Sequence, residues 1–99
     1  NNGVKDGTYR AWYDNGQLEI KSFYIKGKTE GIHRLWYDNG TLEMRCFFKN
    51  GKKEGLYEAW HKNGIMETRS QYKDGLEQGL CEVWYPSGRL KYRWIMKDN

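Results

Sequence analysis

Tryptophan recurs along this 99-residue chain with a constant step of 24 residues, at Trp12, Trp36, Trp60 and Trp84, and only Trp94 falls outside the series. Two glycine columns keep the same step, one at Gly7, Gly31, Gly55 and Gly79 and one at Gly16, Gly40, Gly64 and Gly88. A fixed period of roughly 20–50 residues is typical of repeat architectures, in which each unit contacts only its neighbours. The sequence therefore predicts one domain over residues 1–99, with units at about 7–30, 31–54, 55–78 and 79–99.

Each unit has the pattern of a β-hairpin. In the second unit, strand-like residues 32–37 lead into Asp38-Asn39-Gly40, and a second strand-like run follows at 41–49. Aromatic residues make up 16% of the chain, and they favour strands because flat rings fit a pleated surface and lose rotamer freedom in helices. We predict an all-β fold, an elongated, single-layer, twisted antiparallel sheet of about eight strands built from four stacked hairpins.

The turns predict the register of each hairpin. The fourth unit has Pro86-Ser87-Gly88 at its turn, which suits a type I turn followed by a left-handed glycine bulge. We therefore favour a three-residue loop over a two-residue Asn-Gly turn, and this loop places Trp36 opposite Leu42. Strict alternation then puts one set of side chains from each unit on the same side, the predicted core side. In the second unit these are Ile32, Trp36, Leu42, Met44, Cys46 and Phe48, and their counterparts in the third and fourth units include Tyr72, Tyr92 and Trp94. Arg10, Arg34, Glu58 and Glu82 fall on the same side, where they must reach its edge or pair.

The opposite side is predicted to combine aromatic and charged residues. Its Tyr/His stripe consists of Tyr9, Tyr13, His33, Tyr37, Tyr57, His61 and Tyr85. Tyrosine supplies large rigid area with a polar tip and is enriched in binding surfaces, although packing between strands accounts for such a stripe as well. We take the stripe as the candidate binding surface, with the Trp side as the alternative. Glu19, Glu43 and Glu67 are expected on this side beside Lys21, Arg45, Arg69 and Arg93.

No residue set has the spacing of a catalytic, cofactor or metal site. His33 and His61 replace tyrosine in their repeat columns, which favours an aromatic role over that of a general base or metal ligand. Cys46 and Cys81 are expected about 14 Å apart, whereas a disulfide requires Cα atoms within about 7 Å. A catalytic pair is needed once, so charges repeated in every unit indicate a solvated sheet face. We predict that the protein is not an enzyme and has no catalytic residues, no cofactor and no metal.

Charge and hydropathy limit the partners and the compartment. Seventeen basic and thirteen acidic residues give a net charge of +4, which permits nucleic acid as a partner without indicating it. No apolar run approaches the roughly 20 residues needed to cross a bilayer, and the start of the chain lacks the apolar stretch of a signal peptide. We expect a soluble domain, cytoplasmic or exported, that is a fragment of a longer chain. Its two unpaired sheet edges are expected sites for further repeats or for self-association.

The segment from Gly7 to Leu18 and its three echoes resemble the MORN repeat family. The variant form found in bacterial toxin-antitoxin-associated proteins is the closer match, because Trp-Tyr-x-Asn-Gly-x-Leu is followed by Gly-Lys-x-Glu-Gly. Residues 27–31 and 51–55 fit that second segment, and residues 75–79 depart from it at two positions. The resemblance implies a row of hairpins used for protein contacts, sometimes for dimerisation, with no catalytic residues in the repeat. Some proteins with this repeat are labelled phosphatidylinositol phosphate kinases, and this chain has no phosphate-cradling glycine loop.

Three functions are compatible with the sequence. The first is a non-catalytic protein-protein interaction or scaffolding module, with an antitoxin- or immunity-like protein that binds a toxin as its specific form. The second is peripheral binding of acidic phospholipid or phosphoinositide headgroups, although glutamate is interleaved with the basic column. The third is recognition of cell-wall carbohydrate or choline by aromatic hairpins through cation-π attraction. Nucleic acid ranks behind these because the glutamate column would repel phosphates.

Overall fold

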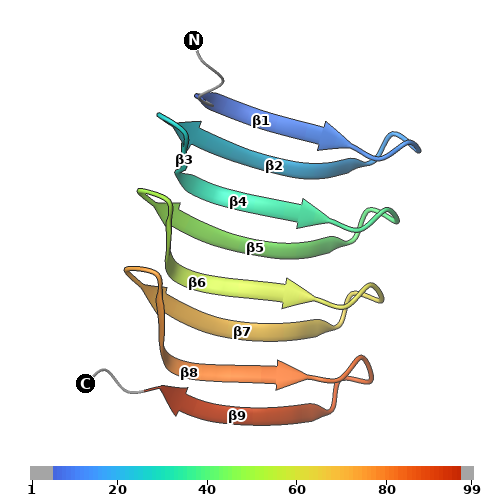
Figure 1. Ribbon diagram of the computed structural model, residues 1–99. Coiled ribbons are helices and arrows are strands. Elements are labelled where there is room, and N and C mark those ends of the chain that lie inside the picture. Colours follow the sequence, from blue (N-terminus) through green and yellow to red (C-terminus); the bar gives the residue numbers. More distant parts are fainter. Residues whose placement is uncertain (1–5, 97–99) are drawn as a thin grey trace.

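The computed structural model describes residues 6–96, which form a single antiparallel sheet and contain no helix (Figure 1). The strands are β1 (Gly7–Trp12), β2 (Leu18–Ile25), β3 (Lys28–Thr29), β4 (Gly31–Trp36), β5 (Leu42–Lys49), β6 (Lys52–Trp60), β7 (Met66–Lys73), β8 (Leu76–Trp84) and β9 (Leu90–Met96). Eight of them follow in the order β1-β2-β4-β5-β6-β7-β8-β9, and the short β3 pairs with β2 off this path. The predicted all-β fold of stacked hairpins is confirmed.

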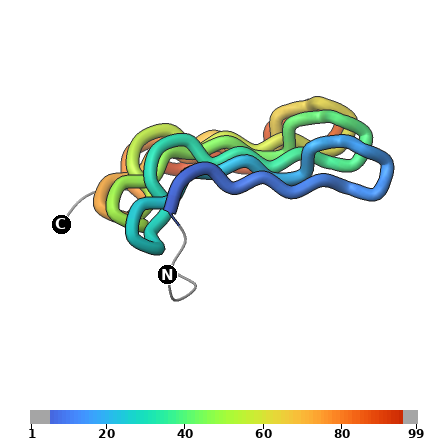
Figure 2. Tube along the Cα trace, turned by 90° about the horizontal axis from the view of Figure 1, so that it is seen from above, coloured from blue at the N-terminus to red at the C-terminus, as the bar shows by residue number. Residues whose placement is uncertain are grey.

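The sheet forms a thin plate. Its principal-axis extents are 45 × 40 × 14 Å, and the trace seen along the sheet is a single curved layer with loops at both ends (Figure 2). The radius of gyration is 15.1 Å, compared with roughly 12–13 Å for a compact domain of similar length. No second layer covers either face within residues 6–96, although a sheet in a soluble domain usually buries at least one face against another element.

All four hairpins have the same first turn. In the second hairpin the amide of Tyr37 donates to the carbonyl of Thr41 at 2.8 Å, and the amide of Gly40 donates back to the carbonyl of Tyr37 at 3.0 Å. Gly40 has a φ of +88°, a conformation that side chains other than glycine adopt at a cost. This is the predicted three-residue loop. It places Trp36 opposite Leu42 as predicted, with equivalent pairs in the other hairpins.

A β-bulge directly beyond each Trp–Leu pair overturns the predicted faces. Trp36 lies opposite Leu42, but Leu35 lies opposite Met44, so Glu43 is an extra residue in β5. One extra residue shifts the alternation of the rest of the strand. The prediction that Met44, Cys46 and Phe48 share the side of Trp36 is therefore wrong, since Cys46 pairs with His33. The same bulge recurs in every hairpin and moves Tyr72, Tyr92 and Trp94 in the same way.

The most buried side chains lie on the side away from the tryptophans, which we call the Tyr face. Its central column pairs an aromatic ring with a small residue on the neighbouring strand: Tyr9 with Ser22, His33 with Cys46, and Tyr57 with Ser70. The small residues are all buried. The fourth hairpin inverts the pair, with buried Cys81 opposite Trp94. Exchanging large for small across one pair keeps the packed volume constant, which accounts for the tryptophan outside the 24-residue series.

Side chains in the first turns join each hairpin to the next. The hydroxyl of Tyr13 donates to the carbonyl of Trp36, and the hydroxyl of Tyr37 donates to the carbonyl of Trp60 at 2.7 Å. His61 Nε2 lies 2.8 Å from the carbonyl oxygen of Trp84. A parallel set of bonds runs from the side-chain amides of three asparagines to carbonyls of the next turn, namely Asn15 to Asp38, Asn39 to Lys62, and Asn63 to Pro86. We call both sets the forward bonds.

Candidate binding surface

The structure separates the predicted Tyr/His stripe into two groups. Tyr9, His33 and Tyr57 lie in the central column of the Tyr face, where their rings meet Tyr24, Phe48 and Tyr72 edge-on or tilted, at centroid distances of 6.4, 5.6 and 5.8 Å. Tyr13, Tyr37 and His61 make the forward bonds. Tyr85 occupies the same position in the last hairpin, is exposed, and lies 5.7 Å from the Lys91 ammonium. Binding by this stripe stays a prediction, and six of its seven members have packing or hydrogen-bonding partners within the fold.

Burial shifts the pKa of several titratable groups of the Tyr face in favour of their neutral forms. Burial lowers the pKa of His33 below its usual value, and burial raises the pKa of Tyr57. Burial also raises the pKa of Cys46 and of Cys81 to about 11. Both cysteines are free and buried. Because the thiolate is the reactive form of cysteine, these thiols are poor nucleophiles and poor metal ligands at neutral pH.

The opposite side, which we call the Trp face, carries three parallel rows of side chains across the strands. The first outer row consists of the pairs Trp12–Leu18, Trp36–Leu42, Trp60–Met66 and Trp84–Leu90. The second outer row consists of Thr8, Phe23, Ile32, Phe47, Leu56, Gln71, Leu80 and Ile95. Both outer rows are mainly apolar, and a charged row lies between them.

The charged row is continuous from one sheet edge to the other. Each member lies opposite the next: Arg10, Lys21, Arg34, Arg45, Glu58, Arg69, Glu82 and Arg93. The prediction that Glu19, Glu43 and Glu67 stand beside the basic column on the Tyr/His side is therefore wrong, again because of the bulge. The row has six basic and two acidic members, an excess of four positive charges that equals the net charge of +4 of the whole chain.

The acidic members of the row are paired. Arg45 donates to Glu58 and also lies 5.7 Å from the centroid of the Trp60 ring. Arg93 and Glu82 form an ion pair at 2.7 Å. Glu58 is buried at 9% exposure, and a buried carboxylate needs such a partner to offset the cost of desolvation. Within residues 6–96 the other basic members, Arg10, Lys21, Arg34 and Arg69, have no ion pair.

The outer rows of the Trp face expose large apolar side chains. Trp12 is 59% exposed, Phe23 and Phe47 are each 41% exposed, and Ile95 is 67% exposed. Exposed apolar side chains that gather on one face typically mark an interaction site. Sequence reasoning treated this side as the core, and the signal that could have corrected it was the four charged residues placed there by strict alternation.

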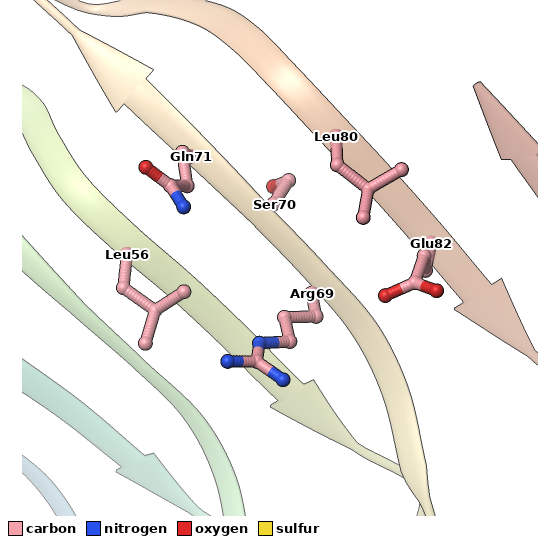
Figure 3. Close-up of a pocket in the computed structure, with 6 residues that line it drawn as sticks. All are labelled: Leu56, Arg69, Ser70, Gln71, Leu80 and Glu82. Carbon is pink, nitrogen blue, oxygen red and sulfur yellow. The ribbon is translucent and has the colours of Figure 1, made fainter. Parts of the chain in front are cut away.

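A shallow hollow of about 220 Å³ lies on the C-terminal half of the Trp face. Figure 3 shows Leu56 from β6 and Leu80 from β8 on either side of Arg69 and Gln71 from β7, with Glu82 at the β8 side. Pockets for small molecules usually measure about 300–1,000 Å³. The hollow is therefore suited to a side chain of a larger partner.

The described residues also limit other kinds of chemistry. Between residues 6 and 96 no group of three or more His, Cys, Asp or Glu side chains could hold a metal ion. In the same range the chain forms no helix long and apolar enough to span a bilayer. What the geometry does provide is a plate with one apolar, positively charged face.

Comparison with known proteins places the repeat in a family. The family model described as MORN repeat variant matches residues 5–26, 29–50 and 53–74. These three matches keep the 24-residue step and together cover more than half of the chain. The hairpin of β8 and β9 lies beyond them, yet its Trp84–Leu90 pair and its bulge have the same register as in the other hairpins. No curated protein matches the chain.

Proposed function

The chain belongs to the family of MORN repeat variants, and we propose that it is a non-catalytic binding module that holds a partner protein on its Trp face. The repeat is a hairpin whose regular features are turns, bulges and packing pairs. We take the fourth hairpin as a divergent copy of the same unit, because its pairing register is that of the first three.

The observation that carries the proposal is the composition of the uncovered Trp face. Apolar side chains such as Phe23 and Phe47 remain exposed there, and between them lies the charged row, whose excess of four positive charges equals the net charge of the chain. Burying apolar surface is the main source of affinity in most protein complexes, and arginine and tryptophan are enriched among the residues that dominate such interfaces. The Tyr face offers less, because most of its rings pack against one another.

A more specific form of the proposal is an antitoxin- or immunity-like role. Occupation of the Trp face by a bacterial toxin would neutralise the toxin by covering its working surface. The support is the resemblance of the units around Trp12, Trp36 and Trp60 to the repeat variant of toxin-antitoxin-associated proteins. Co-expression with a toxic product of a neighbouring gene tests this form, and survival that is lost on Trp36→Ala is the expected result.

Site-specific photo-crosslinking tests which face binds. Phe47 on the Trp face and Tyr92 on the Tyr face are each 41% exposed, so replacing either with a photo-reactive phenylalanine gives a matched pair. The full chain carrying one replacement is irradiated in extract of its source cells. We expect a discrete adduct from the Phe47 position and none from the Tyr92 position. Adducts only from the Tyr92 position would contradict the assignment of the face, and none from either would contradict a protein partner.

A second candidate function is supported by a different part of the molecule, the lysine-rich second turns, which connect β2 to β3, β5 to β6 and β7 to β8. Lys26 and Lys28 line a hollow of about 490 Å³, and Lys49, Lys52 and Lys73 line a neighbouring hollow of about 350 Å³. Clusters of roughly four to eight basic residues are typical of proteins that bind acidic lipid headgroups. Acidic residues share both hollows, which weakens the case. Sedimentation with phosphatidylserine vesicles that is lost in a Lys52→Glu, Lys73→Glu variant would support this function.

A further inference from the structure

The N-terminal half of the charged row places like charges directly opposite one another. Arg10 faces Lys21, Lys21 faces Arg34, and Arg34 faces Arg45. Like charges directly opposite on neighbouring strands destabilise a sheet. The C-terminal half avoids this, because glutamate takes the column of Arg10 and Arg34 in the third and fourth hairpins. The fold therefore accepts a carboxylate at this position, and the basic residues of the first two hairpins require another explanation.

Three of these basic side chains have no counter-charge in the described part of the chain. Arg10, Lys21 and Arg34 form no ion pair with any residue from 6 to 96, whereas Arg45 is bound to Glu58. Neighbouring strands lie about 4.8 Å apart, so the three charges follow one another in steps of about that length across β1, β2 and β4. The arrangement suits an anionic ligand whose charges are spaced at a similar distance.

Apolar side chains border these charges on both sides. Trp12 and Trp36 lie two residues along the strand on one side, and Phe23 and Ile32 lie two residues along on the other. Two residues of strand span about 6.6 Å, so the charged strip and its borders are roughly 13 Å wide. An α-helix with its side chains is about 10–12 Å wide, and acidic residues one turn apart are separated by about 5.4 Å along its axis. An extended strand spaces same-face side chains by about 6.6 Å, which fits the row less well.

We propose that an acidic amphipathic helix of the partner protein lies across β1, β2 and β4, with its carboxylates on Arg10, Lys21 and Arg34 and its apolar flanks on the two outer rows. This inference rests on the proposed function and adds the chemistry of the partner. A phosphate backbone or a lipid headgroup supplies negative charge without apolar side chains on both sides of it, so the bordering Trp12 and Phe23 favour a protein helix. Helix-in-groove recognition is a common mode of binding.

The test uses a labelled helical peptide of about 18 residues with glutamates at i, i+4, i+7 and i+11, leucines on both sides of this stripe, and a matched peptide with glutamine for glutamate. The protein variant is Arg10→Glu, Arg34→Glu, which makes the row alternate in sign as it does beyond Arg45 and is therefore expected to keep its thermal midpoint or raise it. The control variant Lys52→Glu, Lys73→Glu changes the net charge equally at the second turns.

We expect the glutamate peptide to bind the full chain, and the Arg10→Glu, Arg34→Glu variant to bind it at least about 30-fold more weakly, because like charges then meet across the interface. The control variant should change the affinity less than about threefold, and the glutamine peptide should bind more weakly than the glutamate peptide. Equal binding by both variants would overturn the inference. So would binding of polyuridine RNA or phosphatidylserine vesicles that depends on Arg10 and Arg34 while the peptide fails to bind.

Failure of this inference is distinguishable from failure of the proposed function. If the Phe47 position still crosslinks to the cellular partner in the Arg10→Glu, Arg34→Glu variant with unchanged yield, the Trp face binds a protein but not through an acidic helix. If the Phe47 position gives no crosslink even in the protein that keeps Arg10 and Arg34, the proposed function itself fails.

Discussion

Replacing Tyr37 with phenylalanine removes one of the forward bonds and leaves the ring in place. The hydroxyl donates to the carbonyl of Trp60 at 2.7 Å and joins the second hairpin to the third. Its net contribution to stability should be about 0.5–1.5 kcal/mol, since folding exchanges it for hydrogen bonds to water. A loss of about 1 kcal/mol lowers the melting temperature of a domain of this size by about 4–8 °C, and lowers the urea midpoint by roughly 0.5 M if the m-value is about 2 kcal/mol/M.

The chain provides a matched control for this substitution. Tyr85 has the same place in the fourth hairpin, where no hairpin follows within the described residues and its hydroxyl has no partner there. Tyr85→Phe should change the urea midpoint by less than about 0.1 M, within the usual effect of a surface substitution. Equal losses in the two variants, or none for Tyr37→Phe, would refute the assignment of this bond to the cohesion between hairpins.

The pH dependence of the Tyr37 variant gives a second readout. Burial raises the pKa of Tyr37 above 10 in the folded protein. The folded state therefore keeps the proton more readily than the unfolded state. The stability that the protonated hydroxyl contributes is complete below pH 10 and is lost as the pH rises through the higher pKa of the folded protein. The difference in urea midpoint between the original chain and Tyr37→Phe should thus shrink as the pH rises above 10. A constant difference would contradict a bond that requires the protonated hydroxyl.

Three further substitutions probe the interior and the turns. Burial lowers the pKa of His33 in the folded protein, so the unfolded state binds the proton more readily. The stability that results is complete above about pH 6.5 and is lost as the pH falls below this value. His33→Tyr should abolish this loss, which thermal melts at pH 7.5 and pH 5 measure. Gly64 has a φ of +89° with nothing within 4 Å of an added Cβ, so Gly64→Ala should cost about 1–2 kcal/mol through backbone strain alone, and an unchanged urea midpoint would count against it. The Ser22 hydroxyl is buried without a hydrogen-bond partner in the described range, and Cys46 occupies the same position in the next repeat. Ser22→Cys should therefore be neutral or stabilising by up to about 1 kcal/mol. Clear destabilisation in calorimetry would disprove this expectation.

The repeat and the turn chemistry made the architecture predictable. The Gly40 column requires a left-handed residue after each turn, and Pro86 in the fourth unit narrows the loop to three residues. Together they predict the Trp36–Leu42 pairing that the structure has. Each of these features is local to one turn, so comparing the same few positions in the four units is sufficient to determine it.

The faces were not predictable in the same way, because a single inserted residue reverses them. Glu43 lies in the bulge, and residues beyond it alternate in the opposite sense. Both phases of the strand contain large apolar residues, for example Met44 and Phe48 in one and Phe47 in the other, so hydrophobicity does not show where the phase changes. The placement of Arg10, Arg34, Glu58 and Glu82 on a supposed core side was the sign of error. The conflict disappears because that side, the Trp face, is exposed and is not the core.

The forward bonds allow the sheet to be lengthened by whole repeats. Each donor reaches an acceptor 23 residues ahead, so an added copy of residues 31–54 would restore every donor and acceptor at its new boundary. Such a copy would add a second Arg34 and Arg45 to the charged row, and with them two positive charges. A copy of residues 55–78 would instead add Glu58 and Arg69, which cancel. Duplication of one repeat or the other would therefore change the length of the sheet with or without changing the net charge of its Trp face. A family of such proteins can thus acquire new partners by duplicating single repeats.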